Sequence, residues 1–449
     1  MGFKRIGILL QALLVAAVMS GCVFTASVEE LYALPQLPAE YQALDRMIGE
    51  ILSAGAEMIA PAAGSNLQAV QPQDLDGDGV PEILAFFRVS NEDRPLKICI
   101  FRELNEDYEL AATIEGGGTS IYSISYPDMN GDGTREILVS WRVGTQQALT
   151  VYRLEELMPV QLMSASYVRY ETGDIDGDGI QELVVLRGDE SEAGGSTADL
   201  YDWDGTSLIL KSGARLSVAV SELQWMQQGL LESGERAVFV TGRVAGEEDT
   251  SRAVTDILIC REGELRNILL SQITGTSTQI SRYFGLQPQD IDGDGAIEIP
   301  VTATLPATDI NDQMWKIYWY DYYADGSCKS GTITYHNLAD NWYLVIPEEW
   351  DGRFTVVQDN TNAAEHATIF YSLAGRSPDK VLFTVYTLTG DNREAQAAEG
   401  DRMVLRRRSG AVYAIEQGPN FEKWRYTIKL NELIERFNVI TTQWSTGEE

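Results

Sequence analysis

Positive charge, histidine and cysteine are all scarce in this sequence. The chain has 34 lysines and arginines against 67 aspartates and glutamates, which gives a formal net charge of −33. This acidic excess argues against binding of nucleic acid or of anionic lipid headgroups over most of the surface, and it favours cations as partners. The four cysteines show no Cys-x-x-Cys spacing. Neither a disulfide framework nor a zinc site therefore organises the fold.

The common catalytic motifs are also missing. The two histidines, His336 and His366, do not form H-E-x-x-H, and no G-x-S-x-G, P-loop or G-x-G-x-x-G pattern occurs. A structural or solvated role is the simpler interpretation for both histidines. Pairs of catalytic carboxylates, as in glycosidases, are brought together by folding rather than by spacing, so the sequence gives this chemistry no positive support.

The first residues have the pattern of an export signal. Two basic residues precede an apolar stretch at 6–19 that is short for a membrane span, and small residues lead to Cys22. The run MSGC resembles the lipobox of bacterial lipoproteins, with Met where Leu is usual. This resemblance implies that residues 1–21 are a lipoprotein signal peptide and that lipidated Cys22 anchors the protein to the bacterial membrane, outside the cytoplasm. An ordinary cleavable signal is the alternative.

Beyond the signal, one short helix precedes a strand-rich chain. Apolar residues at three-and-four spacing predict a helix within residues 36–56. Downstream, short β-branched and aromatic runs alternate with Gly, Asp and Asn, which is typical of strands and turns. We therefore predict a tether and helix over residues 22–61 and a mainly β fold after them.

A repeated acidic loop is the strongest internal pattern. Four segments align without gaps, and their starts are separated by 54, 46 and 116 residues. Because 116 is twice 58, a unit without the loop is expected near residue 232, and a further step of 58 reaches residue 348, where EEWDGRFTVV suits an eroded copy. The four segments are DLDGDGVPEI from Asp74, DMNGDGTREI from Asp128, DIDGDGIQEL from Asp174 and DIDGDGAIEI from Asp290.

Each unit contains about four strand-like runs in roughly 50 to 60 residues, which is the size of one propeller blade. The sequence therefore predicts a β-propeller of about five to seven blades over residues 62–335, closed by radial repetition. Residues 340–449 are interpreted as a small C-terminal α+β region. In the rival interpretation, part of this region completes the propeller.

The spacing of oxygen-bearing residues in the loops predicts cation sites. Positions 1, 3, 5 and 9 carry carboxylates or an amide, and the carbonyl at position 7 completes an all-oxygen cage that favours Ca²⁺ over Mg²⁺. Up to four calcium ions are expected, and the second site should be the weakest because it holds an amide in place of one carboxylate. The predicted ligand sets are Asp74, Asp76, Asp78, Val80 and Glu82; Asp128, Asn130, Asp132, Thr134 and Glu136; Asp174, Asp176, Asp178, Ile180 and Glu182; and Asp290, Asp292, Asp294, Ala296 and Glu298.

These loops are not EF-hands, because an EF-hand needs a bidentate Glu at position 12 and flanking helices. Position 12 is Ala or Val in all four copies, and each loop runs into a strand. The loops, together with Phe284-Gly285 before the fourth, resemble FG-GAP or VCBS repeats of integrin-alpha-like propellers. That resemblance implies calcium-bound loops between adjacent strands and a role in extracellular adhesion or ligand binding. Glu replaces the family's usual final Asp in every copy.

The sequence thus predicts a calcium-stabilised, membrane-anchored lipoprotein whose propeller binds an extracellular glycan or protein, and no enzyme activity. A secreted carbohydrate-active enzyme, a lyase or hydrolase, is the alternative, and a structural part of an envelope assembly is a third possibility. A pocket with two facing carboxylates near aromatic residues would favour the enzyme.

Overall fold

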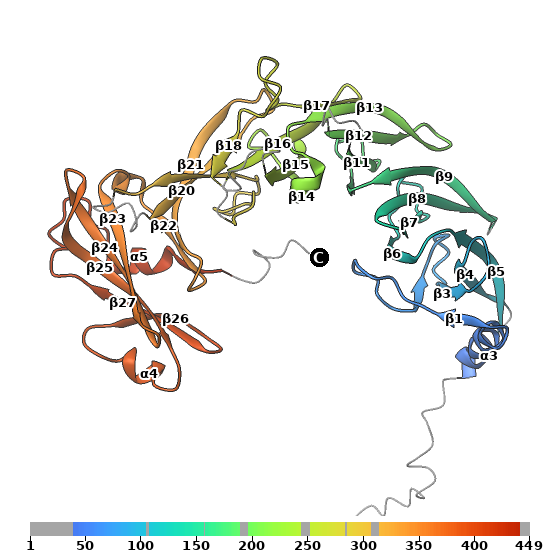
Figure 1. Cartoon of the computed structure of the whole chain (residues 1–449), viewed down its shortest axis with the longest axis horizontal. Coiled ribbons are helices and arrows are strands. Elements are labelled where there is room, and N and C mark those ends of the chain that lie inside the picture. Colours follow the sequence, from blue (N-terminus) through green and yellow to red (C-terminus); the bar gives the residue numbers. More distant parts are fainter. Residues whose placement is uncertain are drawn as a thin grey trace, which may run out of the picture.

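The described strands form six antiparallel sheets that follow one another along the chain. Figure 1 shows these sheets in chain order along an open arc. In the second and fourth sheets the first strand lies toward the inside of the arc and the last strand toward the outside (Figure 1). The export signal, Cys22 and Phe284 lie outside the described part of the chain. The structure, a computed structural model, describes residues 39–104, 107–156, 158–188, 196–243, 252–282, 285–306 and 314–440.

Helix α3 (Ala39–Ser53) confirms the helix expected within residues 36–56. Its buried Leu44 packs against one face of sheet 1, beside Ile83, Ala85 and Phe87. No helix in the described ranges is long and apolar enough to span a membrane. Sheet 1 contains β1 (Ala56–Met58), β2 (Val70–Gln73), β3 (Glu82–Val89), β4 (Leu96–Leu104) and β5 (Asp107–Gly116).

Sheets 2, 3 and 4 repeat one design of four strands joined in sequence order. Sheet 4 includes the unit expected near residue 232, where a tight turn replaces the acidic loop, and a short fifth strand pairs with its third. Sheet 2 contains β6 (Ser120–Ser125), β7 (Ile137–Val143), β8 (Gln146–Glu155) and β9 (Met158–Tyr167). Sheet 3 contains β10 (Arg169–Gly173), β11 (Glu182–Gly188), β12 (Ser196–Trp203) and β13 (Leu208–Leu216). Sheet 4 contains β14 (Leu223–Leu230), β15 (Arg236–Arg243), β16 (Arg252–Arg261), β17 (Glu264–Asn267) and β18 (Ile280–Arg282), and the 3-10 helix η1 (Val220–Glu222) precedes it.

Sheets 5 and 6 form the C-terminal part of the arc. The predicted boundary between the propeller and the C-terminal region, at residues 335–340, lies inside sheet 5, because β21 and β22 pair across it. Sheet 5 contains β19 (Ile299–Thr304), β20 (Trp315–Tyr322), β21 (Cys328–Asn337), β22 (Trp342–Ile346) and β28 (Phe437–Val439). Sheet 6 contains β23 (Phe354–Asn362), β24 (Glu365–Ala374), β25 (Ser377–Thr389), β26 (Met403–Arg408) and β27 (Ala411–Gln417), and the helical turns are η3 (Glu348–Trp350), α4 (Arg393–Gln396) and α5 (Leu430–Glu435).

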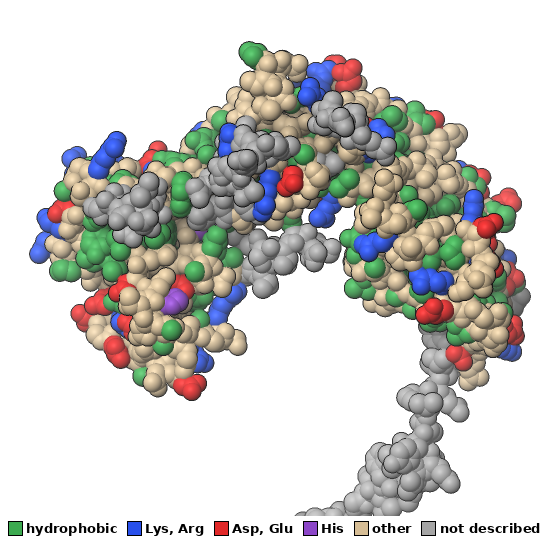
Figure 2. Space-filling view, in the orientation of Figure 1, with side chains coloured by type: hydrophobic (Ala, Val, Ile, Leu, Met, Phe, Trp, Pro, Cys, Tyr) green, Lys and Arg blue, Asp and Glu red, His purple; other side chains and the backbone are tan. Residues whose placement is uncertain are grey.

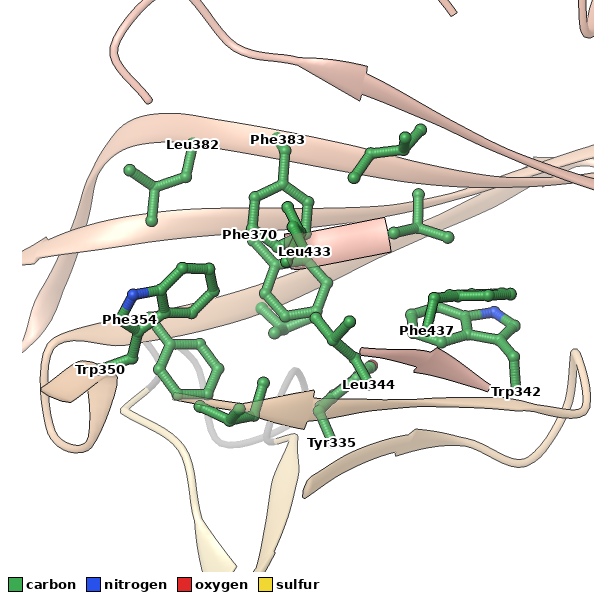
Figure 3. Close-up of a cluster of buried hydrophobic side chains, with 14 of the residues drawn as sticks. Tyr335, Trp342, Leu344, Trp350, Phe354, Phe370, Leu382, Phe383, Leu433 and Phe437 are labelled. Carbon is green, nitrogen blue, oxygen red and sulfur yellow. The ribbon is translucent and has the colours of Figure 1, made fainter. Parts of the chain in front are cut away.

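Neighbouring sheets pack face to face, which explains the continuous apolar runs in the strands that follow the acidic loops. In β3, residues 82–87 are all buried, because one face contacts α3 and the other contacts sheet 2. The largest core lies between sheets 5 and 6 (Figure 3). There the rings of Phe370 and Phe383 stack with centroids 4.4 Å apart, and Trp350 donates its indole N–H to the carbonyl of Tyr426 at 2.7 Å.

The mainly β fold built from successive antiparallel sheets is confirmed, but the sheets of the described residues do not close into the expected ring. The two ends of the arc stand apart in Figures 1 and 2. Helices cover the outward faces that closure would need: α3 lies on sheet 1, and Ala397 after α4 packs with Leu388, Val412 and Ala414 of sheet 6. Terminal units of repeat proteins are commonly capped in this way. Strand β28 also returns to the edge of sheet 5 rather than to sheet 1.

Candidate metal sites

Every acidic loop leads directly into a strand. Three of them connect two paired strands, β2 to β3, β6 to β7 and β10 to β11, and the fourth leads into β19, the first strand of sheet 5. All four loops therefore lie at the same end of their sheets. This placement is the one expected from the repeat alignment.

Backbone amides fold each loop around its first aspartate. In the first loop, Gly77 and Gly79 donate their N–H groups to the two carboxylate oxygens of Asp74, at 2.9 and 3.1 Å. Both glycines have positive φ angles, +77° and +87°, which residues with a Cβ rarely adopt. The amide of Asp78 donates to Asp76 Oδ1 at 3.1 Å. The second and fourth loops repeat these contacts with Asp128 and Asp290.

The glutamate at position 9 is buried in each loop and has one oxygen fixed by the loop itself. Its Oε2 accepts the N–H of the residue at position 2, at 2.6 to 2.9 Å. In three loops the other oxygen, Oε1 of Glu136, Glu182 and Glu298, is buried without a hydrogen-bond partner among the described residues. A buried carboxylate oxygen without a partner is costly, and a bound cation would satisfy it. These residues therefore fit a metal ion.

Burial controls the charge of these glutamates. It raises the pKa of Glu136 and of Glu182 to about 7 and that of Glu298 to about 8, although a backbone N–H partly opposes the shift in each case. Neighbouring aspartates raise these pKa values further. Burial also raises the pKa of Glu82. Without a cation the second, third and fourth loops thus hold protons near neutral pH, and binding a cation would release them.

The loops differ in how closely their carboxylates converge. In the fourth loop all four predicted carboxylates offer oxygens that lie within 4.8 Å of one another. In the first loop the three aspartates meet this limit without Glu82, and in the third Asp174, Asp176 and Glu182 meet it without Asp178. The second loop, with Asn130, forms no such group of three acidic residues. Ligation by the carbonyls of Val80, Thr134, Ile180 and Ala296 stays a prediction; their N–H groups donate to the position-5 carboxylate at 2.7 to 2.8 Å.

A ladder of backbone hydrogen bonds between loops was not predicted from the sequence. The N–H at position 8 of one loop donates to the position-2 carbonyl of the loop before it: Arg135 to Leu75 at 2.8 Å, and Gln181 to Met129 at 3.1 Å. The fourth loop makes the equivalent bond, from the N–H of Ile297 to the carbonyl of Leu230 at the end of β14, at 2.8 Å. Each loop therefore joins two sheets as well as two strands.

Replacing Gly77 with alanine should destabilise the junction between sheets 1 and 2. A Cβ on Gly77 would lie 2.8 Å from the carbonyl oxygen of Gly133 in the next loop, in addition to the strain of a positive φ. We expect Gly77→Ala to lower the free energy of unfolding by about 2 to 3 kcal/mol. Gly79→Ala is the matched control, because Gly79 also has positive φ but a Cβ there meets nothing within 4 Å. The free energy of unfolding of both variants is measured with urea. If Gly77→Ala and Gly79→Ala lowered it equally, the predicted contact between the two loops would be contradicted.

The two histidines lie far from the acidic loops in sequence and do not join them. His336 is buried, stacks on Tyr343 with ring centroids 5.0 Å apart, and has its pKa lowered to about 3 by burial. His366 bonds through Nδ1 to the buried Asp340 at 2.7 Å. Neither belongs to a described group of metal-ligating side chains.

A polar pocket of about 1010 Å³ lies between sheets 2 and 3. Its lining includes the turn after β7 and the end of β11, which are opposite the acidic loops, about 20 Å away along each strand. The described residues of its lining include Arg187, Arg215 and Tyr167 but no carboxylate. These described residues therefore do not supply the two facing carboxylates expected of a carbohydrate-active enzyme.

No family model and no curated protein matches this sequence. Among solved structures, an exotype rhamnogalacturonan lyase, YesX, is 13% identical over 71% of this chain and 73% of its own, with a TM-score of 0.25. A rhamnogalacturonan lyase from Bacillus licheniformis is 10% identical over 72% and 71%, with a TM-score of 0.26. The Dos1 propeller is 9% identical over 75% and 74%, with a TM-score of 0.25. Likenesses this weak carry no conclusion about function.

Proposed function

We propose that this protein is a calcium-binding lipoprotein, anchored outside the cytoplasm of a bacterium, whose array of sheets binds an extracellular glycan or protein. The observation that carries the calcium proposal is the buried, unpartnered Oε1 of Glu136, Glu182 and Glu298. Each lies at the end of an acidic loop, and the oxygens of Glu182 and Glu298 lie within 4.8 Å of those of aspartates in the same loop. The resemblance of the loops to FG-GAP or VCBS repeats supports the same interpretation.

The donor set favours calcium over magnesium and over transition metals. All predicted ligands are oxygens, and no His or Cys side chain belongs to the described groups, so soft-metal chemistry has no support. Calcium accepts six to eight oxygens in flexible arrangements, whereas magnesium demands a near-ideal octahedron and keeps much of its water. When bound, the ion would neutralise the carboxylates of a loop and fix the strand that follows. Its role would be structural rather than catalytic.

Calorimetric titration tests the choice of ion. We expect calcium to bind to chelator-treated protein with release of protons, and magnesium to bind far more weakly. Proton release is measured by repeating the titration in buffers of different ionisation enthalpy. Equal binding of both ions, or calcium binding with no proton exchange at pH 7, would contradict the role given to the buried glutamates.

The anchor rests on Cys22 and is tested separately. In the bacterial host, the wild-type protein should enter the detergent phase after temperature-induced phase separation. Cys22→Ser should remain in the aqueous phase, because it lacks the thiol that carries the lipid. A wild-type protein found only in the aqueous phase would contradict the lipoprotein proposal and leave an ordinary cleaved signal.

A further inference from the structure

Arginines recur at the ends of the sheets that are opposite the acidic loops. In each of the first four sheets, the strand that follows the acidic loop, or the turn that replaces it in sheet 4, ends at or next to an arginine: Arg88, Arg142, Arg187 and Arg243. Figure 2 shows blue Lys and Arg side chains along the inner margin of the arc over these sheets. The arginine therefore recurs with the repeat, but it is not one of the residues predicted to bind a cation.

The polar pocket lies within this arginine-bearing end. It is bounded by the turn after β7, the end of β9, the end of β11 and the end of β13. Among the described residues, two arginines and no aspartate or glutamate line it. Neutral amide and hydroxyl side chains fill the rest of the polar lining, among them Gln146, Gln147 and Ser166. Its volume lies at the upper end of the range of about 300 to 1,000 Å³ usual for ligand pockets.

The two lining arginines differ in what holds them. Arg187 forms an ion pair with the buried Asp199 of β12, which orients its side chain while 43% of it stays exposed. Arg215 is exposed and forms no ion pair with any described carboxylate. It lies beside Gly275, where even an added Cβ would be 3.8 Å from its guanidinium nitrogens. The pocket thus presents one guanidinium oriented by an ion pair and one that forms no ion pair within the described part of the chain.

We infer that this pocket binds a carboxylated oligosaccharide, which names the ligand class for the extracellular binding proposed above and rests on that proposal. Guanidinium groups pair with carboxylates through two parallel hydrogen bonds, and amide and hydroxyl side chains pair with sugar hydroxyls. Uronic acid chains alternate these two kinds of group along their length. An acidic peptide would present carboxylates without the hydroxyls that the neutral lining matches.

The probe is a uronic acid hexamer, hexagalacturonate, with its methyl ester and hexaglutamate as comparison ligands. Binding is measured by calorimetry on calcium-loaded protein after free calcium is removed, so that calcium bridging is avoided. We expect hexagalacturonate to bind, and the ester and hexaglutamate to bind at least tenfold more weakly. Equal binding of the ester would overturn carboxylate recognition, and equal binding of hexaglutamate would overturn the saccharide class.

Variants locate the site. Arg215→Gln, which breaks no ion pair, and Arg187→Gln/Arg215→Gln should weaken hexagalacturonate binding by about tenfold to a hundredfold. The matched control is Arg261→Gln/Arg266→Gln, which removes two exposed arginines paired with Glu235 and Glu264 in sheet 4. Unchanged binding in Arg215→Gln and in the double variant, or equal loss in the control, would overturn the assignment. Calcium binding is measured on the same samples. Normal calcium binding without hexagalacturonate binding would contradict the pocket proposal alone, whereas loss of calcium binding would contradict the cation sites.

Discussion

Excess calcium should raise the thermal unfolding midpoint of mature protein, residues 22–449, by about 10 °C or more relative to chelator. A ligand that binds only the folded state at 100 times its dissociation constant adds about 2.7 kcal/mol per site. Several loops are expected to bind calcium, so their stabilising effects add. Each loop also forms a hydrogen bond to the neighbouring sheet, as Arg135 does to Leu75. Calcium should therefore stabilise the junctions between sheets as well as the loops.

Magnesium at the same concentration is the control, because it has the same charge and ionic strength but a poorer fit to a flexible oxygen cage. We expect it to recover only a small part of the rise. If the midpoint were the same with calcium and with chelator, the cation sites would be contradicted. If both ions acted equally, general screening of the acidic surface would explain the effect.

Replacing three buried glutamates with glutamine should remove the pH dependence of stability and weaken the response to calcium. In the cation-free protein the raised pKa values of Glu136, Glu182 and Glu298 mean that the folded state binds more protons than the unfolded chain. The free energy of unfolding should then fall as pH rises from about 4.5 through about 7 and 8. Glutamine mimics the protonated acid, so the triple variant should lose this fall and gain about 3 kcal/mol over wild type at pH 8.5 in chelator.

The same triple variant should keep less than half of the calcium-dependent rise, because an amide oxygen is a weaker ligand than a carboxylate. A matched control replaces three exposed glutamates that form surface ion pairs, Glu155, Glu264 and Glu394. That control removes the same formal charge and should behave like wild type. The prediction fails if the two triple variants show the same pH profile and the same response to calcium.

The acidic loops could be predicted from the sequence because their determinants are local. All candidate ligands of a loop lie within nine residues, from Asp74 to Glu82 in the first copy, and glycines occupy the positions that need positive φ. The repeat spacing also located sheet 4, where the turn after Leu230 replaces the acidic loop. Helix α3 was predicted for the same reason, since its apolar spacing is visible in one short segment.

The open arc could not be predicted in this way. Closure depends on what covers the outer faces of the terminal sheets, and α4 is a four-residue helix without a sequence pattern of its own. The hydrogen bonds between loops join backbone groups, such as the N–H of Gln181 and the carbonyl of Met129. Because almost every residue has these groups, the sequence does not show which of them pair. The pocket was missed because its arginines, Arg187 and Arg215, lie on different strands and meet only in the folded chain.

The most direct test of the account is a crystal structure grown with calcium, with the ions located by anomalous scattering. We predict a peak in each acidic loop, strongest in the fourth and weakest in the second, with an Oε1 ligand distance of about 2.3 to 2.6 Å to Glu298. Such peaks would show that the buried glutamates complete the cages. Loops without peaks at millimolar calcium, or ions bound only to surface carboxylates away from Glu136, Glu182 and Glu298, would contradict the central claim.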